Sequence, residues 1–367
     1  MSGRSISVDI VRVPTKGPGD VSGLMQLVAD GKIAPSSILA VLGKTEGNGG
    51  VNDFTREYAV AALCEALAPH LGLKARAVEN RIAFVMSGGT EGVLSPHLTV
   101  FTRNVADTNG GAGDKRFSIG IAHTRDFLPE EIGRKVQIDE TVKAVHAAMK
   151  DAGIDDAADV HFVQVKCPLL TSERIEGALH RGNKTVTTGA YSSMGYSRGA
   201  SALGVALALG EIEKFDETEV LKNWGLYSSV ASASAGIELM HNVVIVMGNS
   251  VAATSPFVIG HALMRDAIDL PAVIEALKSV GLGLADARMQ DRLVNIFAKA
   301  EASPDGAVRG FRHTMLDDSD VGSTRHARAA VGGLIGGLSG TGAVYVSGGA
   351  EHQGPPGGGP VAVIARV

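Results

Sequence analysis

The stretch FVMSGGTEGV, residues 84–93, decides the fold, because two similar stretches follow it along the chain. Residues 231–240 read ASASAGIELM, and residues 344–352 read VYVSGGAEH. Each contains Ser-[Gly/Ala]-Gly-x-Glu and is followed by an apolar run typical of a strand. A single short pattern is weak, but three copies in matching context indicate an internal threefold repeat. The repeated residues are Ser87, Ser234 and Ser347, with Glu91, Glu238 and Glu351.

A second recurring element lies upstream of each serine, where an apolar run ends in a lysine. SILAVLGK and VHFVQVK are typical of strands, whereas LVNIFAK is ambiguous between strand and helix. In the first and third copies the lysine is followed by x-Glu, at Glu46 and Glu301, but Pro168 stands there in the second. The three lysines are Lys44, Lys166 and Lys299.

A third element, between lysine and serine, is an arginine that opens an Ala/Gly/Leu-rich helical pattern. Arg56 precedes EYAVAALCEAL, and Arg198 precedes GASALGVALALG. In the third copy both Arg325 and Arg328 precede AAVGGLIGGL. Local similarity favours Arg325, whereas the position directly against the helix favours Arg328, so the choice stays open.

Together the three elements predict an α/β chain built from three related units. Each copy runs strand–Lys, Arg–helix, strand–Ser and strand, which needs ~100–120 residues, an ordinary domain size. Boundaries are expected in NVADTNGGAGD, residues 104–114, and near NSVAATSP, residues 249–256. The predicted units are 1–104, 112–250 and 256–367.

Composition excludes several classes of function. The net charge of −5 provides no basic face for nucleic acid, so a polyanionic partner is not expected. No apolar run reaches the ~18–20 residues that a membrane helix needs, and the first residues show no signal-peptide pattern. Two cysteines far apart, Cys64 and Cys167, fit a reducing cytoplasm better than a disulfide framework. Strand alternation places Cys167 on the opposite face from Lys166, as a buried core thiol.

Serine and lysine can together perform nucleophilic catalysis. A serine hydroxyl needs a base, and neither a G-x-S-x-G elbow nor a histidine recurring with the serines is present. A neutral lysine can replace histidine when burial or nearby cations lower its pKa. Glycines beside the serines leave backbone N–H groups accessible as an oxyanion hole. Glu91, Glu238 and Glu351 are expected to pair with the cations rather than act as acids.

In combination these motifs resemble the cyanuric acid hydrolase/barbiturase family over essentially the whole chain, including the C-terminal GGAEHQGPPGGGP. The resemblance implies three pseudo-symmetric α/β units whose sheets form a central barrel-like core, with the site on the pseudo-threefold axis. It also implies a homotetramer. It assigns Ser234 as nucleophile and Lys166 as its base. The substrate-binding residues that it implies are Arg56, Ser87, Gly88, Lys44, Arg198, Ala235, Lys299, Ser347 and Gly348, with Arg325 or Arg328.

The resemblance further implies hydrolytic ring opening of cyanuric acid to carboxybiuret, which then loses carbon dioxide to give biuret. The alternatives are a barbiturase that opens barbituric acid to ureidomalonate and a non-catalytic heterocycle-binding protein. One asymmetry independently favours the middle copy as the catalytic one. Lys166 lacks the x-Glu neighbour, and a lysine without a carboxylate keeps the lower pKa that suits a base.

The resemblance also implies a structural divalent cation and no catalytic cofactor. A carboxylate with carbonyl oxygens from a Gly/Pro loop suits a hard ion such as Mg²⁺ or Ca²⁺. No His/Cys cluster has the spacing of a catalytic zinc site. The implied ligands are Glu301 and oxygens of Ala350, Gln353, Gly354, Pro355 and Gly358.

Overall fold

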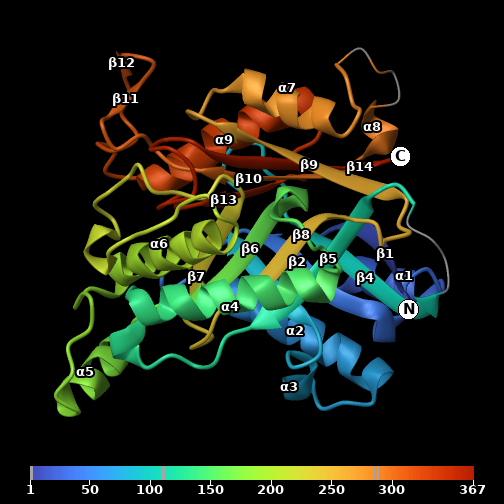
Figure 1. Ribbon diagram of the computed structural model, residues 1–367, viewed down its shortest axis with the longest axis horizontal. Helices are drawn as coiled ribbons and strands as arrows, with labels where there is room; N and C mark the ends of the chain where they lie inside the picture. The colour runs from blue at the N-terminus through green and yellow to red at the C-terminus, as the bar shows by residue number, and fades with distance from the viewer. Residues whose placement is uncertain (1–2, 109–112, 285, 287–288) are drawn as a thin grey trace.

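The computed structural model describes residues 3–108, 113–284, 286 and 289–367. It confirms the mixed α/β class, with three four-stranded sheets and a small hairpin formed by β11 (Ala307–Val308) and β12 (Phe311–Arg312). Strands occupy the middle of the molecule and helices lie around them (Figure 1). Part of the expected boundary 104–114, residues 109–112, lies outside the described residues, and β4 continues past residue 104 to Thr108.

All three sheets have the same strand order. The first sheet runs β1-β4-β2-β3, the second β5-β8-β6-β7 and the third β9-β14-β10-β13. In each, the last two strands are parallel and the other neighbours are antiparallel. The strands are β1 (Gly3–Pro14), β2 (Ile38–Thr45), β3 (Ala83–Gly88), β4 (His97–Thr108), β5 (Arg116–His123), β6 (Val160–Pro168), β7 (Ala231–Gly236), β8 (Val243–Ser250), β9 (Phe257–Met264), β10 (Leu293–Ala300), β13 (Tyr345–Gly348) and β14 (Gly359–Arg366).

A register shift recurs near the start of the lysine-bearing strand in each sheet. The extra residue of this bulge is Leu39 in β2, His161 in β6 and Val294 in β10. A bulge adds one residue against the partner strand and increases the local twist. The ambiguous run LVNIFAK is therefore a strand, with the same irregularity as its two counterparts.

Helices cover the outer faces of the sheets (Figure 1). α2 packs on the first sheet, α4 and α6 on the second, and α7 and α9 on the third. The expected arginines lie in these helices, in α2, α6 and α9. The helices are α1 (Ser22–Ala29), α2 (Phe54–Leu71), α3 (Ala75–Val78), α4 (Lys135–Ala152), α5 (Ser172–His180), α6 (Ala190–Ala208), α7 (Leu270–Ser279), α8 (Met289–Arg292) and α9 (Ser323–Ser339), with 3₁₀ turns η1 (Pro35–Ser37), η2 (Pro129–Glu131), η3 (Ala157–Asp159) and η4 (Glu217–Glu219).

The inner faces of the three sheets share one apolar cluster. Aromatic rings gather in it although only 4% of the chain is aromatic. The Phe297 ring lies 5.5 Å from that of Phe162 and 6.5 Å from that of Phe101, centroid to centroid, so residues from all three sheets meet. Among the described residues, strand pairing does not close the sheets into a barrel; Ile6 and Ala253 form one isolated bridge. The expected barrel-like closure is therefore not shown.

Two expectations from composition can be compared with the fold. Within the described part of the chain, no helix is long and apolar enough to cross a membrane. Cys64 and Cys167 are both free and buried. Cys167 packs into the core between the second sheet and its helices, as its alternation with Lys166 predicted.

Candidate active site

The three serines and three lysines pair off across the parallel strands. In each sheet the lysine at the end of one strand stands directly opposite the serine of its parallel neighbour. Parallel neighbours end at the same edge of a sheet, so both side chains reach that edge. The register pairs are Lys44 with Ser87, Lys166 with Ser234, and Lys299 with Ser347.

The serines converge on one small pocket. Its walls come from strands of all three sheets and from helices α2, α6 and α9. The lysines do not line it but lie behind the serines, with side chains no more than 1% exposed. The expected nucleophile Ser234 and most of the expected substrate-binding residues line the pocket, the latter being Arg56, Ser87, Gly88, Arg198, Ala235, Arg328, Ser347 and Gly348.

Two of the lysines bind the serine opposite them. Lys44 Nζ donates to Ser87 Oγ at 3.1 Å and to the Val346 carbonyl at 2.7 Å. Lys299 Nζ donates to Ser347 Oγ at 3.1 Å and to backbone carbonyls beside it. These two Lys–Ser pairs are therefore preformed.

Lys166 has a different partner. Its Nζ lies 2.7 Å from Glu238 Oε1 and donates to the Met86 carbonyl at 3.3 Å. Among the described residues, Ser234 Oγ has no lysine partner; it shares a hydrogen bond of 3.1 Å with Ser347 Oγ. The expectation that Lys166 lacks a carboxylate is therefore wrong. The fold supplies one from the glutamate of the Ser-x-Gly-x-Glu pattern, which is far from Lys166 in sequence.

Burial affects the basicity of all three lysines, since removing an ammonium from water favours the neutral amine. Burial and the nearby Arg198 lower the pKa of Lys299 to about 7. Burial and Arg328 hold the pKa of Lys44 well below its usual value. Burial lowers the pKa of Lys166 as well, while the charge of Glu238 opposes that shift.

Glutamates hold two of the pocket arginines. Glu351 binds Arg198 Nε at 2.7 Å, and Glu91 binds Arg328 Nε at 2.8 Å, each with a second contact to the same guanidinium. The predicted pairing of these glutamates with cations is confirmed. Arg325 also reaches Glu91, but its side chain is 43% exposed and lines only a wider outer cavity. The structure therefore places Arg328, and not Arg325, in the inner pocket.

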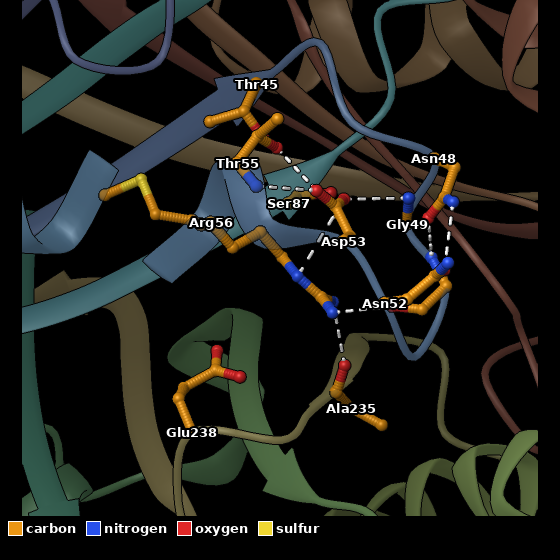
Figure 2. Close-up of polar contacts among 12 residues, drawn as sticks. Thr45, Asn48, Gly49, Asn52, Asp53, Thr55, Arg56, Ser87, Ala235 and Glu238 are labelled. Carbon is orange, nitrogen blue, oxygen red and sulfur yellow. Dashed lines mark hydrogen bonds and ion pairs between the residues drawn. The ribbon is translucent and has the colours of Figure 1, made fainter. Parts of the chain in front are cut away.

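Arg56 is held by backbone instead (Figure 2). Its Nη1 donates to the Ala235 carbonyl at 3.0 Å and its Nη2 to the Gly50 carbonyl at 2.7 Å. Its Nε is buried and has no hydrogen-bond partner among the residues that the structure describes. The nearest carboxylate is Asp53, at 3.9 Å.

Asp53 is a residue that the sequence reasoning missed. Its carboxylate accepts from the backbone N–H of Thr55, which caps α2, and from that of Gly49, which fixes the loop beside the pocket (Figure 2). An acidic residue directly before a helical pattern is a known capping signal, so the position was detectable. The hydrogen bond that Asp53 accepts from Gly49 in the loop could not be predicted from the sequence.

The expected metal ligands lie together beside the third sheet. Glu301 follows β10, and residues 350–358 form the loop between β13 and β14. Among the described residues, the Glu301 carboxylate accepts hydrogen bonds only from the backbone N–H groups of Ala302 and Ala350. Burial and the charge of Glu351 raise the pKa of Glu301. A carboxylate in this setting, next to a loop rich in carbonyls, fits a hard cation.

Comparison with known proteins identifies the family. A family profile described as amidohydrolase ring-opening protein matches residues 9–366. The cyanuric acid amidohydrolase of Bradyrhizobium diazoefficiens is 72% identical over 99% of both chains. That of Pseudomonas sp. (strain ADP) is 61% identical over 98% of this chain and 99% of its own.

Solved structures agree with this match. A structure described as "Cyanuric acid hydrolase: evolutionary innovation by structural concatenation" is 61% identical, with a TM-score of 0.95 over 99% of this chain and 100% of its own. A cyanuric acid hydrolase structure from A. caulinodans is 49% identical, with a TM-score of 0.90 over 98% of this chain and 99% of its own. The resemblance inferred from the repeated motifs is therefore confirmed, and the chain belongs to the amidohydrolase ring-opening family, as a hydrolase.

Proposed function

We propose that this enzyme opens the ring of cyanuric acid by hydrolysis, giving carboxybiuret, which loses carbon dioxide to form biuret. The observation that carries the proposal is one pocket lined by three serines from the three sheets and by three arginines from the helices that cover them. Cyanuric acid has three equivalent carbonyl groups, so a site with threefold recurrence matches its shape. Similarity to proteins named cyanuric acid amidohydrolase supports the same substrate.

We infer that the three sheets with their helices are pseudo-symmetric repeats, corresponding to units 1–104, 112–250 and 256–367. Their common strand order, bulge position and Lys–Ser register support this inference. The pocket would then lie on a pseudo-threefold axis. Each unit contributes one serine, one lysine behind it and one arginine, and only one serine needs to react.

In the proposed mechanism Ser234 Oγ attacks a ring carbonyl and Lys166 Nζ accepts the serine proton. The C–N bond breaks as Lys166 returns that proton to the leaving nitrogen, leaving an acyl group on Ser234. A water molecule then attacks the acyl carbon and releases carboxybiuret, with Lys166 again passing the proton. Ser234 is 8% exposed, compared with 6% for Ser87 and 2% for Ser347, so it is accessible from the pocket.

The remaining pocket residues hold the ring. Ser87 with Gly88 and Ser347 with Gly348 would bind the two carbonyls that do not react, with Lys44 and Lys299 polarising these serines from behind. Arg56, Arg198 and Arg328 would donate to ring oxygens. The backbone N–H of Ala235 would stabilise the oxyanion, a contribution of about 3–4 kcal/mol in other enzymes.

A second catalytic pair is favoured by one observation. Lys299 already binds Ser347, and its pKa of about 7 leaves about half of it neutral at neutral pH. Lys166 is bound to Glu238, whose charge opposes the lowering of its pKa by burial. This pair predicts that Ser347, and not Ser234, forms the acyl-enzyme.

The substrate is tested by incubating the purified enzyme with cyanuric acid or barbituric acid and following the loss of ring ultraviolet absorbance. We expect turnover of cyanuric acid. The alternative within the family is a barbiturase, which opens barbituric acid to ureidomalonate. Barbituric acid differs from cyanuric acid by one ring atom. Turnover of barbituric acid alone would replace the proposed substrate and leave the proposed residues in place.

We also propose that Glu301 and carbonyl oxygens of Ala350, Gln353, Gly354, Pro355 and Gly358 hold Mg²⁺ or Ca²⁺. The Gln353 side chain is occupied, because its Oε1 accepts from Ala233 N at 2.7 Å, so its backbone oxygen would be the ligand. The ion would fix the loop that carries Glu351 and take no part in the reaction. A chelator should then lower the melting temperature, and either ion should restore it. An unchanged melting temperature in metal-free protein would exclude the site.

The assembly is proposed as a homotetramer, on the resemblance alone. Light scattering after size-exclusion chromatography measures the mass directly. A mass near that of one 37.8 kDa chain would contradict the proposal.

A further inference from the structure

The three glutamates of the repeated pattern do not behave alike. Glu91, from the first sheet, binds Arg328 on the helix of the third, and Glu351, from the third, binds Arg198 on the helix of the second. Continuing this cyclic order, Glu238 of the second sheet should bind Arg56 on the helix of the first. The structure shows that it does not.

Glu238 binds Lys166 instead, at 2.7 Å. Among the described residues the buried Arg56 Nε has no hydrogen-bond partner, and its nearest carboxylate is Asp53, at 3.9 Å (Figure 2). In the other two arginines the equivalent Nε atom donates to a glutamate, at 2.7 and 2.8 Å. A buried N–H without an acceptor costs free energy. The unused Arg56 Nε therefore indicates that the Glu238 carboxylate has a second position, in which it accepts from this N–H.

The glycine two residues before each glutamate shows the same difference. A Cβ at Gly89 would contact the Arg328 guanidinium, and one at Gly349 the Arg198 guanidinium, both within 2.6 Å. A Cβ at Gly236 would instead contact the Glu238 carboxylate, at 2.2 Å from Oε2. In the second sheet the glutamate therefore occupies the space over the glycine that an arginine occupies in the others.

We propose that Glu238 is a positioning residue that alternates between Lys166 and Arg56 Nε in step with the charge on Lys166. The proposal rests on the proposed role of Lys166 as the base. Before the reaction the Lys166 ammonium loses its proton to solvent water, and Glu238 turns to Arg56. When Lys166 then accepts the Ser234 proton, Glu238 returns and stabilises the new ammonium until the leaving nitrogen takes the proton.

The electrostatic surroundings favour a charged carboxylate in the observed position against Lys166. Burial alone would raise the pKa of Glu238, but the charges of Lys166 and Arg56 outweigh it and lower the pKa to about 2. The other titratable groups nearby are Cys167 beside Lys166, Glu79 and Arg174 near Glu238, and Asp53, 3.9 Å from Arg56 Nε. Only Lys166 among these groups would change charge during the reaction.

The test is the pH profile of kcat/KM for Glu238→Gln. The profile rises with pH as the base loses its proton. Without the Glu238 charge the Lys166 pKa falls, so the rise should move to lower pH by about one unit or more. The kcat should fall about tenfold or more, since the ammonium formed during attack loses its partner. A structural role alone would lower kcat and leave the profile in place.

Glu91→Gln and Glu351→Gln are the matched controls. Each removes a glutamate from a pocket arginine, so KM should rise while the profile stays fixed. Substrate ionisation is common to all variants and cancels in the comparison. An unmoved profile in Glu238→Gln overturns the proposal, and a shift in Glu351→Gln instead would assign the base to Lys299. If the wild-type enzyme opens only barbituric acid, the proposed substrate fails and the same profiles still test Glu238.

A measurement on the unaltered enzyme covers the case in which Glu238→Gln does not fold. Crystal structures at pH 6 and at pH 10 should place the Glu238 carboxylate against Lys166 Nζ and against Arg56 Nε, respectively. The same Lys166 contact at both pH values overturns the proposal.

Discussion

At the scale of single residues, the three lysines occupy equivalent register positions yet have different partners. Lys44 and Lys299 donate to serines and carbonyls, and Lys166 faces a carboxylate. Equivalent backbone positions therefore do not produce equivalent basicity. Lys44 and Lys299 are therefore hydrogen-bond donors to serines, whereas Lys166 pairs with the charge of Glu238.

The serines should differ as sharply as the lysines. We expect Ser234→Ala to lower kcat by about ten-thousand-fold or more, because it removes the nucleophile. Ser87→Ala and Ser347→Ala should mainly raise KM, by about ten- to a hundredfold, because each removes one contact to a carbonyl. Steady-state kinetics of the three variants measures this directly. The largest kcat loss in Ser347→Ala would favour the Lys299–Ser347 pair.

The two arginines of α9 offer a second comparison at this scale. Arg328→Gln should raise KM by about tenfold or more and lower stability, since it also leaves the partly buried Glu91 with less compensation. Arg325→Gln should change KM by less than about threefold, because its half-exposed side chain faces only the outer cavity. Kinetics and thermal melting of both variants decide it; equal KM effects would contradict the assignment of Arg328.

At the scale of elements, the start of α2 links helix stability to the pocket. The Asp53 carboxylate caps the helix and also holds Gly49, which lines the pocket. Asp53→Ala should cost about 1–2 kcal/mol of folding free energy and also raise KM, because the loop and Arg56 lose a common support.

Thr171→Ala is the matched control, since Thr171 caps α5 through Arg174 N and does not line the pocket. It should lower the melting temperature to a similar degree and leave KM near its wild-type value. Unchanged KM in Asp53→Ala would show that its cap is purely structural.

The elements also show how far the sequence alone could lead. Each Ser-x-Gly stretch and each lysine run became a strand, and the arginines lie in helices, because these patterns reflect local backbone preference. Partners that come from distant segments were not accessible. The x-Glu neighbour of the first copy misled for this reason: Glu46 is exposed to solvent, whereas Glu238 reaches Lys166 only through the tertiary fold. The choice between Arg325 and Arg328 also needed the packed pocket.

At the scale of the whole molecule, the junctions between sheets differ in chemistry. The bulge positions Leu39 and Val294 carry apolar side chains packed on the shared core, whereas His161 of the second sheet meets His261 of the third at 2.9 Å between Nδ1 atoms. Two imidazoles can share this hydrogen bond only while one of the facing nitrogens is unprotonated. This junction should therefore weaken in acid.

Burial and His261 lower the pKa of His161 to about 4, below its ordinary value near 6.5; Asp159 lies near His161, and Glu211 and Glu275 lie near His261. A histidine with a lowered folded-state pKa contributes stability above pH 6.5 that is lost as pH falls toward 4. His161→Leu introduces the residue found at the equivalent bulge position of the first sheet, Leu39. Its melting temperature should fall less between pH 7 and pH 4.5 than that of the wild-type protein. Identical pH dependence in both proteins would contradict this role.

The ion pairs between glutamates and arginines of different repeats also determine when, during synthesis of the chain, the pocket becomes complete. Ser347 lies in β13 and Glu351 in the loop that follows it, and they complete a pocket whose other serines come from the first and second sheets. A nascent chain that has not yet extended past Glu351 leaves Arg198 without its counterion and the pocket without a wall. Hydrolytic capacity therefore arises only when synthesis is almost finished, so that a prematurely terminated product would be inert.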